Sequence, residues 1–132
     1  MDPSRLAAIP LFAPLDAEHI DALAEVATET DAVEGQSLAT EGDFGHALYA
    51  IEAGTAEVTH NGEVVRALGP GDLFGEVAVL QSGRRTATVT ATSPMTLIAI
   101  FKRDVWRLEQ QSPEAAERLR ALVADRLAGQ TS

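Results

Sequence analysis

Residues 69–91 read Gly-Pro-Gly-Asp-Leu-Phe-Gly-Glu-Val-Ala-Val-Leu-Gln-Ser-Gly-Arg-Arg-Thr-Ala-Thr-Val-Thr-Ala. This stretch opens with a Gly69-Pro70-Gly71 turn, reaches Gly75 just before a short apolar run, and closes on a Thr/Val alternation that is typical of a strand. It therefore predicts a turn that leads into a brief helix, and then a second turn that leads into a strand.

Two features of this stretch favour an anion. Gly75 has no Cβ, so another group can approach its backbone closely, and the first N–H groups of the helical turn after it point outward without intrahelical partners. Arg84 and Arg85 follow, and they are the only cationic residues between Arg66 and Lys102. Because an arginine fork can hold two phosphate oxygens, the two features together predict one phosphate site.

The run Phe74-Gly75-Glu76-Val77-Ala78-Val79-Leu80, followed by Arg84-Arg85-Thr86-Ala87-Thr88-Val89, resembles the phosphate-binding cassette of cyclic-nucleotide-binding domains. Such domains occur in cyclic-nucleotide-gated channels, cyclic-nucleotide-dependent protein kinases and the catabolite activator family. The resemblance implies a jelly-roll fold and a cyclic nucleotide, cAMP or cGMP, as the ligand. We call residues 74–89 the cassette.

The resemblance also implies a role for each residue of the cassette. Arg85 is expected to contact the cyclic phosphate and Arg84 to face solvent, although Arg85 also fits an ordinary surface position in a turn. Glu76 is expected to accept a hydrogen bond from the ribose 2′-OH, although a first-turn Glu also complements a helix dipole. Thr86, a β-branched residue that also fits a strand, is expected to bond a phosphate oxygen or a syn guanine, which leaves both nucleotides open. The expected binding residues are Phe74, Gly75, Glu76, Val77, Ala78, Arg85, Thr86 and Ala87.

Members of this family close over the base with an apolar or arginine residue on the last helix. Packing against the barrel is the alternative role for each residue that stands there in this chain. The candidates for the base cap are Leu119, Leu122, Val123 and Arg126.

Length and composition indicate one globular domain over residues 1–132. The chain has 132 residues, of which 45% are hydrophobic and 23% charged, close to the globular average. It has no cysteine, which excludes disulfides and thiolate metal sites and is compatible with a reducing cytoplasm. No apolar run approaches the roughly 20 residues of a membrane span. We therefore expect a cytoplasmic domain that makes no membrane contact by itself.

The negative net charge of the chain limits the kinds of partner that it can bind. The net charge is −10, and the segment from Ala7 to Val65 holds twelve Asp or Glu residues and no Lys or Arg. Such a surface repels nucleic acid, so this chain alone is not expected to bind it, and the charge also serves solubility. A small anion can still bind if its cation and N–H donors are local.

The central part of the chain is rich in short strand patterns between glycine turns. Asn61-Gly62 between two of these patterns is a strong hairpin signal, because both turn positions take positive φ angles. Strands are expected over residues 37–40, 47–52, 55–60, 63–68, 86–92 and 96–101. This number of short strands predicts a mainly β, double-sheet jelly roll over residues 31–101, flanked by N-terminal and C-terminal helices.

The flanking segments carry helical signals. In the lead-in, residues 1–30, Asp2 and Asp16 are expected to cap helices over about 4–9 and 17–28. The C-terminal part, residues 102–128, is expected to hold a short helix with Trp106 in the core. A break at Ser112-Pro113 should follow, and then a last helix with an apolar stripe. We expect this last helix to move with ligand and to carry the signal, or to pair with its copy in a homodimer.

Catalytic motifs are absent from the sequence. There is no Gly-x-Ser-x-Gly elbow, cysteine nucleophile, P-loop or HExxH, and His19, His46 and His60 are too scattered for a metal set, so they are expected at the surface. We therefore expect no enzyme activity, no metal and no cofactor other than the nucleotide ligand.

Three functional hypotheses remain. The leading one is a non-catalytic regulatory module that binds a cyclic nucleotide and acts on an effector domain through its terminal helices. The second is the sensor domain of a catabolite-activator-type regulator, with ligand binding retained or lost. It requires DNA binding elsewhere, because only residues 129–132 follow the last helix. The third, a cupin-like enzyme, requires clustered His and Glu ligands that the sequence lacks.

Overall fold

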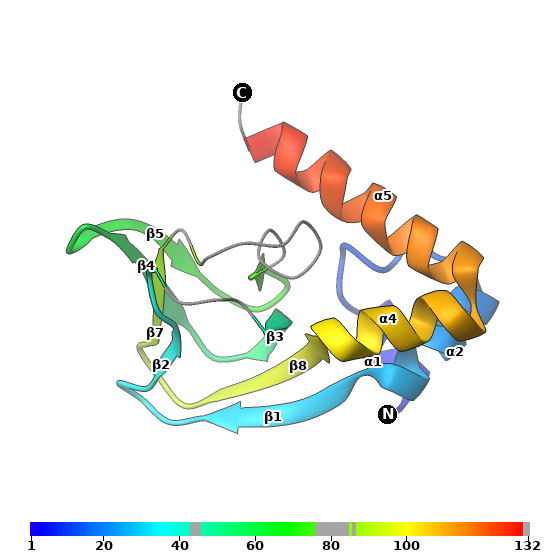
Figure 1. The fold of residues 1–132 in the computed structure, drawn as a ribbon. Coiled ribbons are helices and arrows are strands. Elements are labelled where there is room, and N and C mark those ends of the chain that lie inside the picture. The colour runs from blue at the N-terminus through cyan, green and yellow to red at the C-terminus, as the bar shows by residue number, and fades with distance from the viewer. Residues whose placement is uncertain (43–45, 76–84, 86, 131–132) are drawn as a thin grey trace. The chain divides into compact units, whose positions relative to one another are not determined.

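The computed structural model describes residues 1–42, 46–75, 85 and 87–130, and the chain falls into two compact units (Figure 1). The helical unit comprises residues 1–28 and 103–132, and the jelly-roll unit comprises residues 29–102. The predicted brief helix after Gly75 lies outside the described residues.

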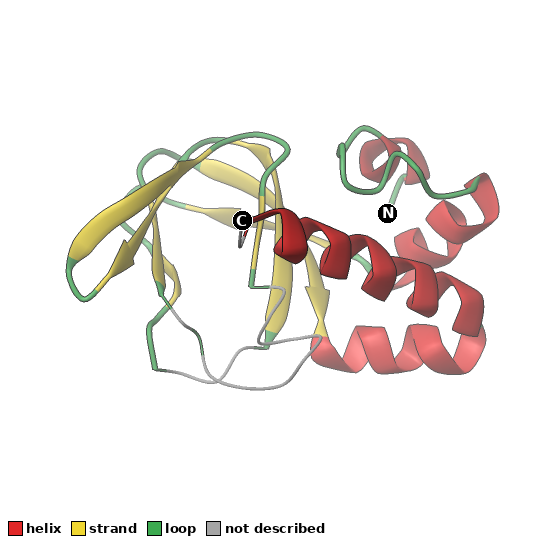
Figure 2. Cartoon of the chain, turned by 90° about the horizontal axis from the view of Figure 1, so that it is seen from above, coloured by secondary structure: helices red, strands yellow, loops and turns green. Residues whose placement is uncertain are grey.

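The described strands of the jelly-roll unit form two four-stranded sheets (Figure 2). The first has the order β1 (Thr28–Ala32), β8 (Met95–Phe101), β3 (Ala47–Ala53) and β6 (Leu73–Phe74). The second has the order β2 (Ser37–Ala39), β7 (Thr88–Ala91), β4 (Ala56–His60) and β5 (Glu63–Leu68). The predicted mainly β, double-sheet architecture is therefore confirmed.

Apolar side chains from both sheets form one core. Ile51 of β3 and Leu97 of β8 belong to the same buried cluster as Val89 and Ala91 of β7. Along β7 the buried residues alternate with partly exposed ones, as a strand with one face on a core requires. Burying each large aliphatic side chain stabilises the fold by about 1.5–3 kcal/mol, so this cluster holds the two sheets together.

The β4–β5 hairpin, at one end of the jelly-roll unit in Figure 1, has the predicted turn. Asn61 has φ 52° and Gly62 has φ 82°, and His60 pairs with Glu63 across the turn. The expected hairpin is thereby confirmed. Two strands were not expected: β1 has mostly exposed polar residues and no apolar alternation, and β6 has only two residues.

The helical unit contains α1 (Pro3–Ala7), α2 (Ala17–Val26), α5 (Pro113–Gln130) and all but the first residue of α4 (Lys102–Gln111). The Asp2 cap of α1 is confirmed: the Ser4 N–H and hydroxyl donate to its Oδ1 over 2.9 and 2.8 Å. These two bonds, the backbone bond first, lower the pKa of Asp2 because they stabilise the ionised carboxylate.

Three local expectations for this unit are wrong. Asp16 makes no side-chain cap bond, and its Oδ2 instead lies 4.0 Å from Nδ1 of His19, whose side chain is largely covered rather than at the surface. Trp106 is 61% exposed, because α4 turns Asp104, Val105 and Leu108 inward instead.

The junction of α4 and α5 shows the expected break. The Ser112 N–H donates to the Leu108 carbonyl over 2.7 Å, and the Ser112 carbonyl accepts from the Ala116 N–H over 3.1 Å. Ser112 therefore closes the last turn of α4 and opens the first turn of α5. No helix among the described residues is both long and apolar enough to cross a membrane.

Candidate anion-binding site at Arg85

Arg85 is a buried side chain of the jelly-roll unit. It is 9% exposed, and its Nη2 donates a hydrogen bond of 2.8 Å to the carbonyl oxygen of Ala47, the first residue of β3. The alternative reading of Arg85 as a surface residue in a turn is therefore wrong. This bond orients the guanidinium relative to the start of β3.

Gly75 fits closely against this arginine. It follows β6 with φ +86°, a conformation that favours glycine. A Cβ on Gly75 would overlap Nη1 of Arg85 and would lie 2.6 Å from the Ala47 carbonyl oxygen. The predicted close approach to the Gly75 backbone is thus present, and the group that makes it is the Arg85 guanidinium.

Phe74 holds Gly75 in place from within the core. Its ring stacks on Tyr49 with the centroids 5.0 Å apart and the planes at 26°, and it is buried. Tyr49 and Phe74 are also paired across β3 and β6. Sheet pairing and ring stacking together fix the end of β6, and with it the position of Gly75 beside Arg85.

The turn at Glu41 and Gly42 also holds the segment around Arg85, a role that was not expected. The Gly42 N–H donates to the Arg85 carbonyl over 3.0 Å, and the Glu41 N–H donates to Thr88 Oγ1 over 3.0 Å. Glu41 Oε1 also lies 2.5 Å from Nδ1 of His60. The sequence indicated only a turn at Gly42. It could not indicate that Ala47 accepts a hydrogen bond from Arg85, because a backbone carbonyl is present in every residue and has no side-chain signature.

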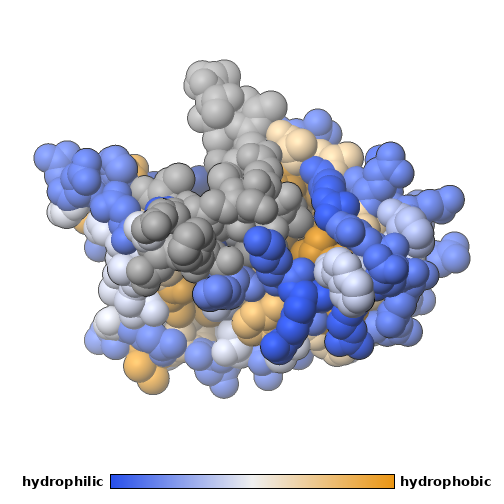
Figure 3. Space-filling model, in the orientation of Figure 1, coloured by the Kyte–Doolittle hydropathy of each residue, from blue (hydrophilic) through white to orange (hydrophobic). Residues whose placement is uncertain are grey.

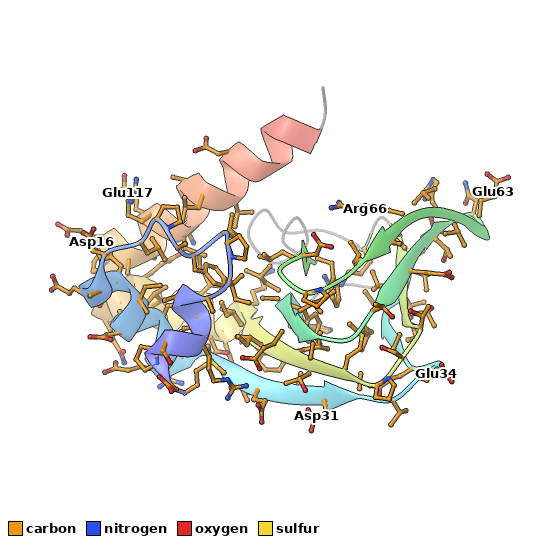
Figure 4. The ribbon with its side chains drawn as sticks, turned by 180° about the vertical axis from the view of Figure 1, so that it is seen from behind. Asp16, Asp31, Glu34, Glu63, Arg66 and Glu117 are labelled. Atoms are coloured by element: carbon orange, nitrogen blue, oxygen red, sulfur yellow. The ribbon has the colours of Figure 1, made fainter. Side chains whose placement is uncertain are left out.

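Three acidic residues of the jelly-roll unit, Asp31, Glu34 and Glu63, are exposed at its surface. Asp31 and Glu34 project outward beside β1, and Glu63 stands at the tip of the β4–β5 hairpin (Figure 4). Solvent and salt screen such exposed charges strongly, whereas a buried charge is screened much less. The buried guanidinium and the glycine backbone beside it form a local environment that suits a phosphate despite the acidic chain.

Part of the expected cassette is not covered by these observations. Ala87 is partly buried and directly precedes β7. Glu76, Val77, Ala78, Arg84 and Thr86 lie outside the described residues, and their roles stay predictions.

The base-cap candidates belong to α5 of the helical unit, and their role also stays a prediction. Leu119 and Val123 are buried and Leu122 is half-buried, whereas the side chain of Arg126 is not described. Among the described residues, no three His, Cys, Asp or Glu side chains come together as a metal site.

Comparisons with known proteins show which proteins this chain is similar to. The family model of the cyclic nucleotide-binding domain matches residues 30–112. The cyclic AMP receptor protein of Thermus thermophilus is 36% identical over 123 residues, which cover 89% of this chain and 57% of that protein. A cAMP-dependent protein kinase regulatory subunit of Yarrowia lipolytica is 39% identical over 102 residues, 76% of this chain and 27% of the subunit.

A solved structure is similar over nearly its whole length. It is the N-terminal domain of a transcriptional regulator from Streptomyces coelicolor A3(2), with a TM-score of 0.81 and 32% identity. The match covers 96% of this chain and 94% of that structure. The chain spans little more than half of the Thermus thermophilus protein and about a quarter of the Yarrowia lipolytica subunit.

Proposed function

The chain belongs to the cyclic nucleotide-binding domain family, and we propose that it is a non-catalytic regulatory module that binds cAMP or cGMP and transmits occupancy through its terminal helices. The observation that carries this proposal is the buried Arg85 guanidinium, held by the Ala47 carbonyl and packed against Gly75. A cation fixed in this way binds an anion with little further ordering cost.

The remaining residues of the cassette complete the proposal. Glu76 binds the ribose 2′-OH, the backbone amides at positions 75, 77 and 78 line the phosphate and ribose, and Thr86 contacts the phosphate and, in cGMP, the base. One of the α5 candidates covers the base, and the half-buried Leu122 retains surface that a base can cover. We also propose that the module acts on an effector domain and that the protein is cytoplasmic. A cysteine-free chain is compatible with a reducing compartment.

A second candidate function is the sensor domain of a transcription regulator. It is favoured by the Streptomyces structure, which is the N-terminal domain of such a regulator and matches this chain over almost its full length. In that case a DNA-binding part would be supplied outside these residues. A DNA-binding assay of the native protein purified from cells separates the two candidates, because only a transcription regulator would bring a DNA-binding part.

Calorimetric titration with cAMP and with cGMP tests the leading proposal, and linear AMP and GMP serve as controls that lack the cyclic phosphate. Binding of either cyclic nucleotide is expected to raise the melting temperature by about 10 °C at a ligand concentration of about 100 times Kd, since linkage adds about 2.7 kcal/mol. The absence of both heat and a melting shift at millimolar concentrations of both nucleotides would contradict the proposal.

A further inference from the structure

The exposed face of α4 combines an aromatic ring with cations. Trp106 is exposed, and Lys102, Arg103 and Arg107 are exposed beside it. Lys102 and Arg103 stand four and three positions before Trp106, and helical side chains tilt toward the N-terminus, so the indole lies over the turn that carries these two cations. We call Lys102, Arg103, Trp106 and Arg107 the basic-aromatic face.

This face is unusual for the chain. It holds three of the ten Lys and Arg residues in a protein of net charge −10. The visible surface is mostly hydrophilic, with apolar side chains in separate patches (Figure 3). The acidic residues of α4 lie near cations: Asp104, which is buried, is 3.8 Å from Arg107, and Glu109 is paired with Arg120. Trp and Arg are the residues most enriched at the energetic centres of protein interfaces, so this composition indicates a surface that binds protein.

A complementary feature lies on α2. Glu18, Asp21 and Glu25 are all exposed, and their spacing of three and then four residues places them along one ridge of the helix. The ridge is about 10 Å long at 1.5 Å per residue. Within the part of the chain that the structure describes, these carboxylates form no ion pair, and α2 carries no Lys or Arg. We call these three residues the acidic ridge.

We propose that a second copy of this chain docks through these two surfaces, with the acidic ridge of each copy against the basic-aromatic face of the other. A two-fold axis makes the same contact twice, because each copy carries both surfaces. The acidic ridge of one copy then lies against the basic-aromatic face of the other at each contact, and Trp106 becomes covered. The net charge of −10 opposes any contact that lacks such local complementarity.

Sedimentation velocity of the full chain without nucleotide tests the association, at concentrations from about 1 to 300 µM, which covers weak homodimers. We expect a monomer–dimer equilibrium in this range. Trp106→Ala should weaken it at least about tenfold, as loss of a central interface tryptophan does. The matched control Arg118→Glu, an exposed charge reversal on α5, should leave the dimer unchanged. Circular dichroism and melting temperature confirm that each variant is folded.

Charge reversal then identifies the paired surfaces. The variant Lys102→Glu with Arg107→Glu should be monomeric, and so should Glu18→Lys with Asp21→Lys and Glu25→Lys. An equimolar mixture of the two variants should dimerise again, because each supplies the charge that the other now needs. A wild-type chain that stays monomeric throughout, or a dimer that none of these changes weakens, would overturn the proposal. Failure of the mixture to dimerise would also overturn it.

Discussion

The Nη2 atom of Arg85 donates a hydrogen bond of 2.8 Å to the carbonyl oxygen of Ala47, although the two residues are 38 positions apart in the sequence. Arg85 precedes β7 of one sheet, and Ala47 begins β3 of the other. The bond therefore links the two sheets and holds the guanidinium in one orientation. A ligand phosphate that binds there does not need to order a free arginine side chain first.

Replacement of Arg85 tests its proposed role as the phosphate ligand. Arg85→Ala should weaken cyclic nucleotide binding at least about thirtyfold more than Arg84→Ala or Arg118→Ala. Loss of a sequestered charge costs about 2–5 kcal/mol, whereas loss of a peripheral charge costs little. Calorimetric titration of the three variants measures the difference. Similar affinities for all three would show that Arg85 does not bind the ligand.

Replacement of Gly75 tests the close packing against Arg85. Gly75→Ala and Gly62→Ala both place a side chain at positive φ, +86° and +82°, so each introduces backbone strain of about 1–2 kcal/mol. Only the Cβ at position 75 meets other atoms, since nothing lies within 4 Å of the one at position 62. Urea unfolding should therefore show a loss for Gly75→Ala that is larger by about 1–3 kcal/mol. Equal losses would show that the site relaxes without cost.

Replacement of Thr86 tests how the site selects its base. Thr86→Ala should weaken cGMP binding more than cAMP binding, because only guanine loses a base contact in addition to the phosphate contact. Parallel titrations of the wild type and the variant with both nucleotides give the two ratios. If the two ratios are the same, Thr86 does not read the base.

The cap of α1 leads to a prediction about pH. Because hydrogen bonds from Ser4 hold the pKa of Asp2 below its ordinary value of 3.8, the ionised carboxylate is favoured in the folded state. Its contribution to stability is fully present above that ordinary value and is lost as the pH falls through the lower folded pKa. In an NMR titration, Ser4→Ala should raise the pKa of Asp2, since the hydroxyl bond is removed and the backbone bond remains. An unchanged or lower value would contradict this account.

Hydrogen exchange with and without nucleotide tests the last helix as the signalling element. Ligand should raise protection over residues 113–128 as well as in the cassette, because a helix that covers the base exchanges more slowly in its docked state. The matched control is the Arg85→Ala variant, which should show neither change at the same ligand concentration. Protection confined to the cassette would assign signal transmission to the N-terminal helices instead.

Elements whose local sequence decides their structure were predictable. The Asn61-Gly62 turn needs two positive φ angles, and β5 has the expected bounds of residues 63–68. The break before Pro113 follows from the restriction that proline places on Ser112. In each case the preference of a few adjacent residues agrees with the tertiary structure, so the pattern alone was sufficient.

The wrong or missing predictions concern features whose structure depends on tertiary contacts rather than on adjacent residues. Trp106 was expected in the core, because size and hydrophobicity do not tell which face of α4 is covered. β1 was missed because its residues are mostly polar and exposed, so it lacks the alternation of a half-buried strand. In the candidate site, the motif drew attention to Arg85, whose role as a ligand stays a prediction. The contacts of Ala47 and Gly42 were not predictable, because they act through backbone atoms that distant segments bring together.

The space that a side chain would fill at position 75 is occupied by the guanidinium at position 85, and this has an evolutionary consequence. A homologue with any larger residue at position 75 cannot also keep an arginine in the Arg85 conformation, so substitutions at the two positions should be correlated across descendants of a common ancestor. Lineages that abandon the nucleotide are free to lose the arginine first and the glycine afterwards. If the glycine were lost first, the intermediate protein would be strained. Among homologues that no longer bind the nucleotide, glycine at position 75 with a neutral residue at position 85 should therefore be commoner than arginine at 85 with a larger residue at 75.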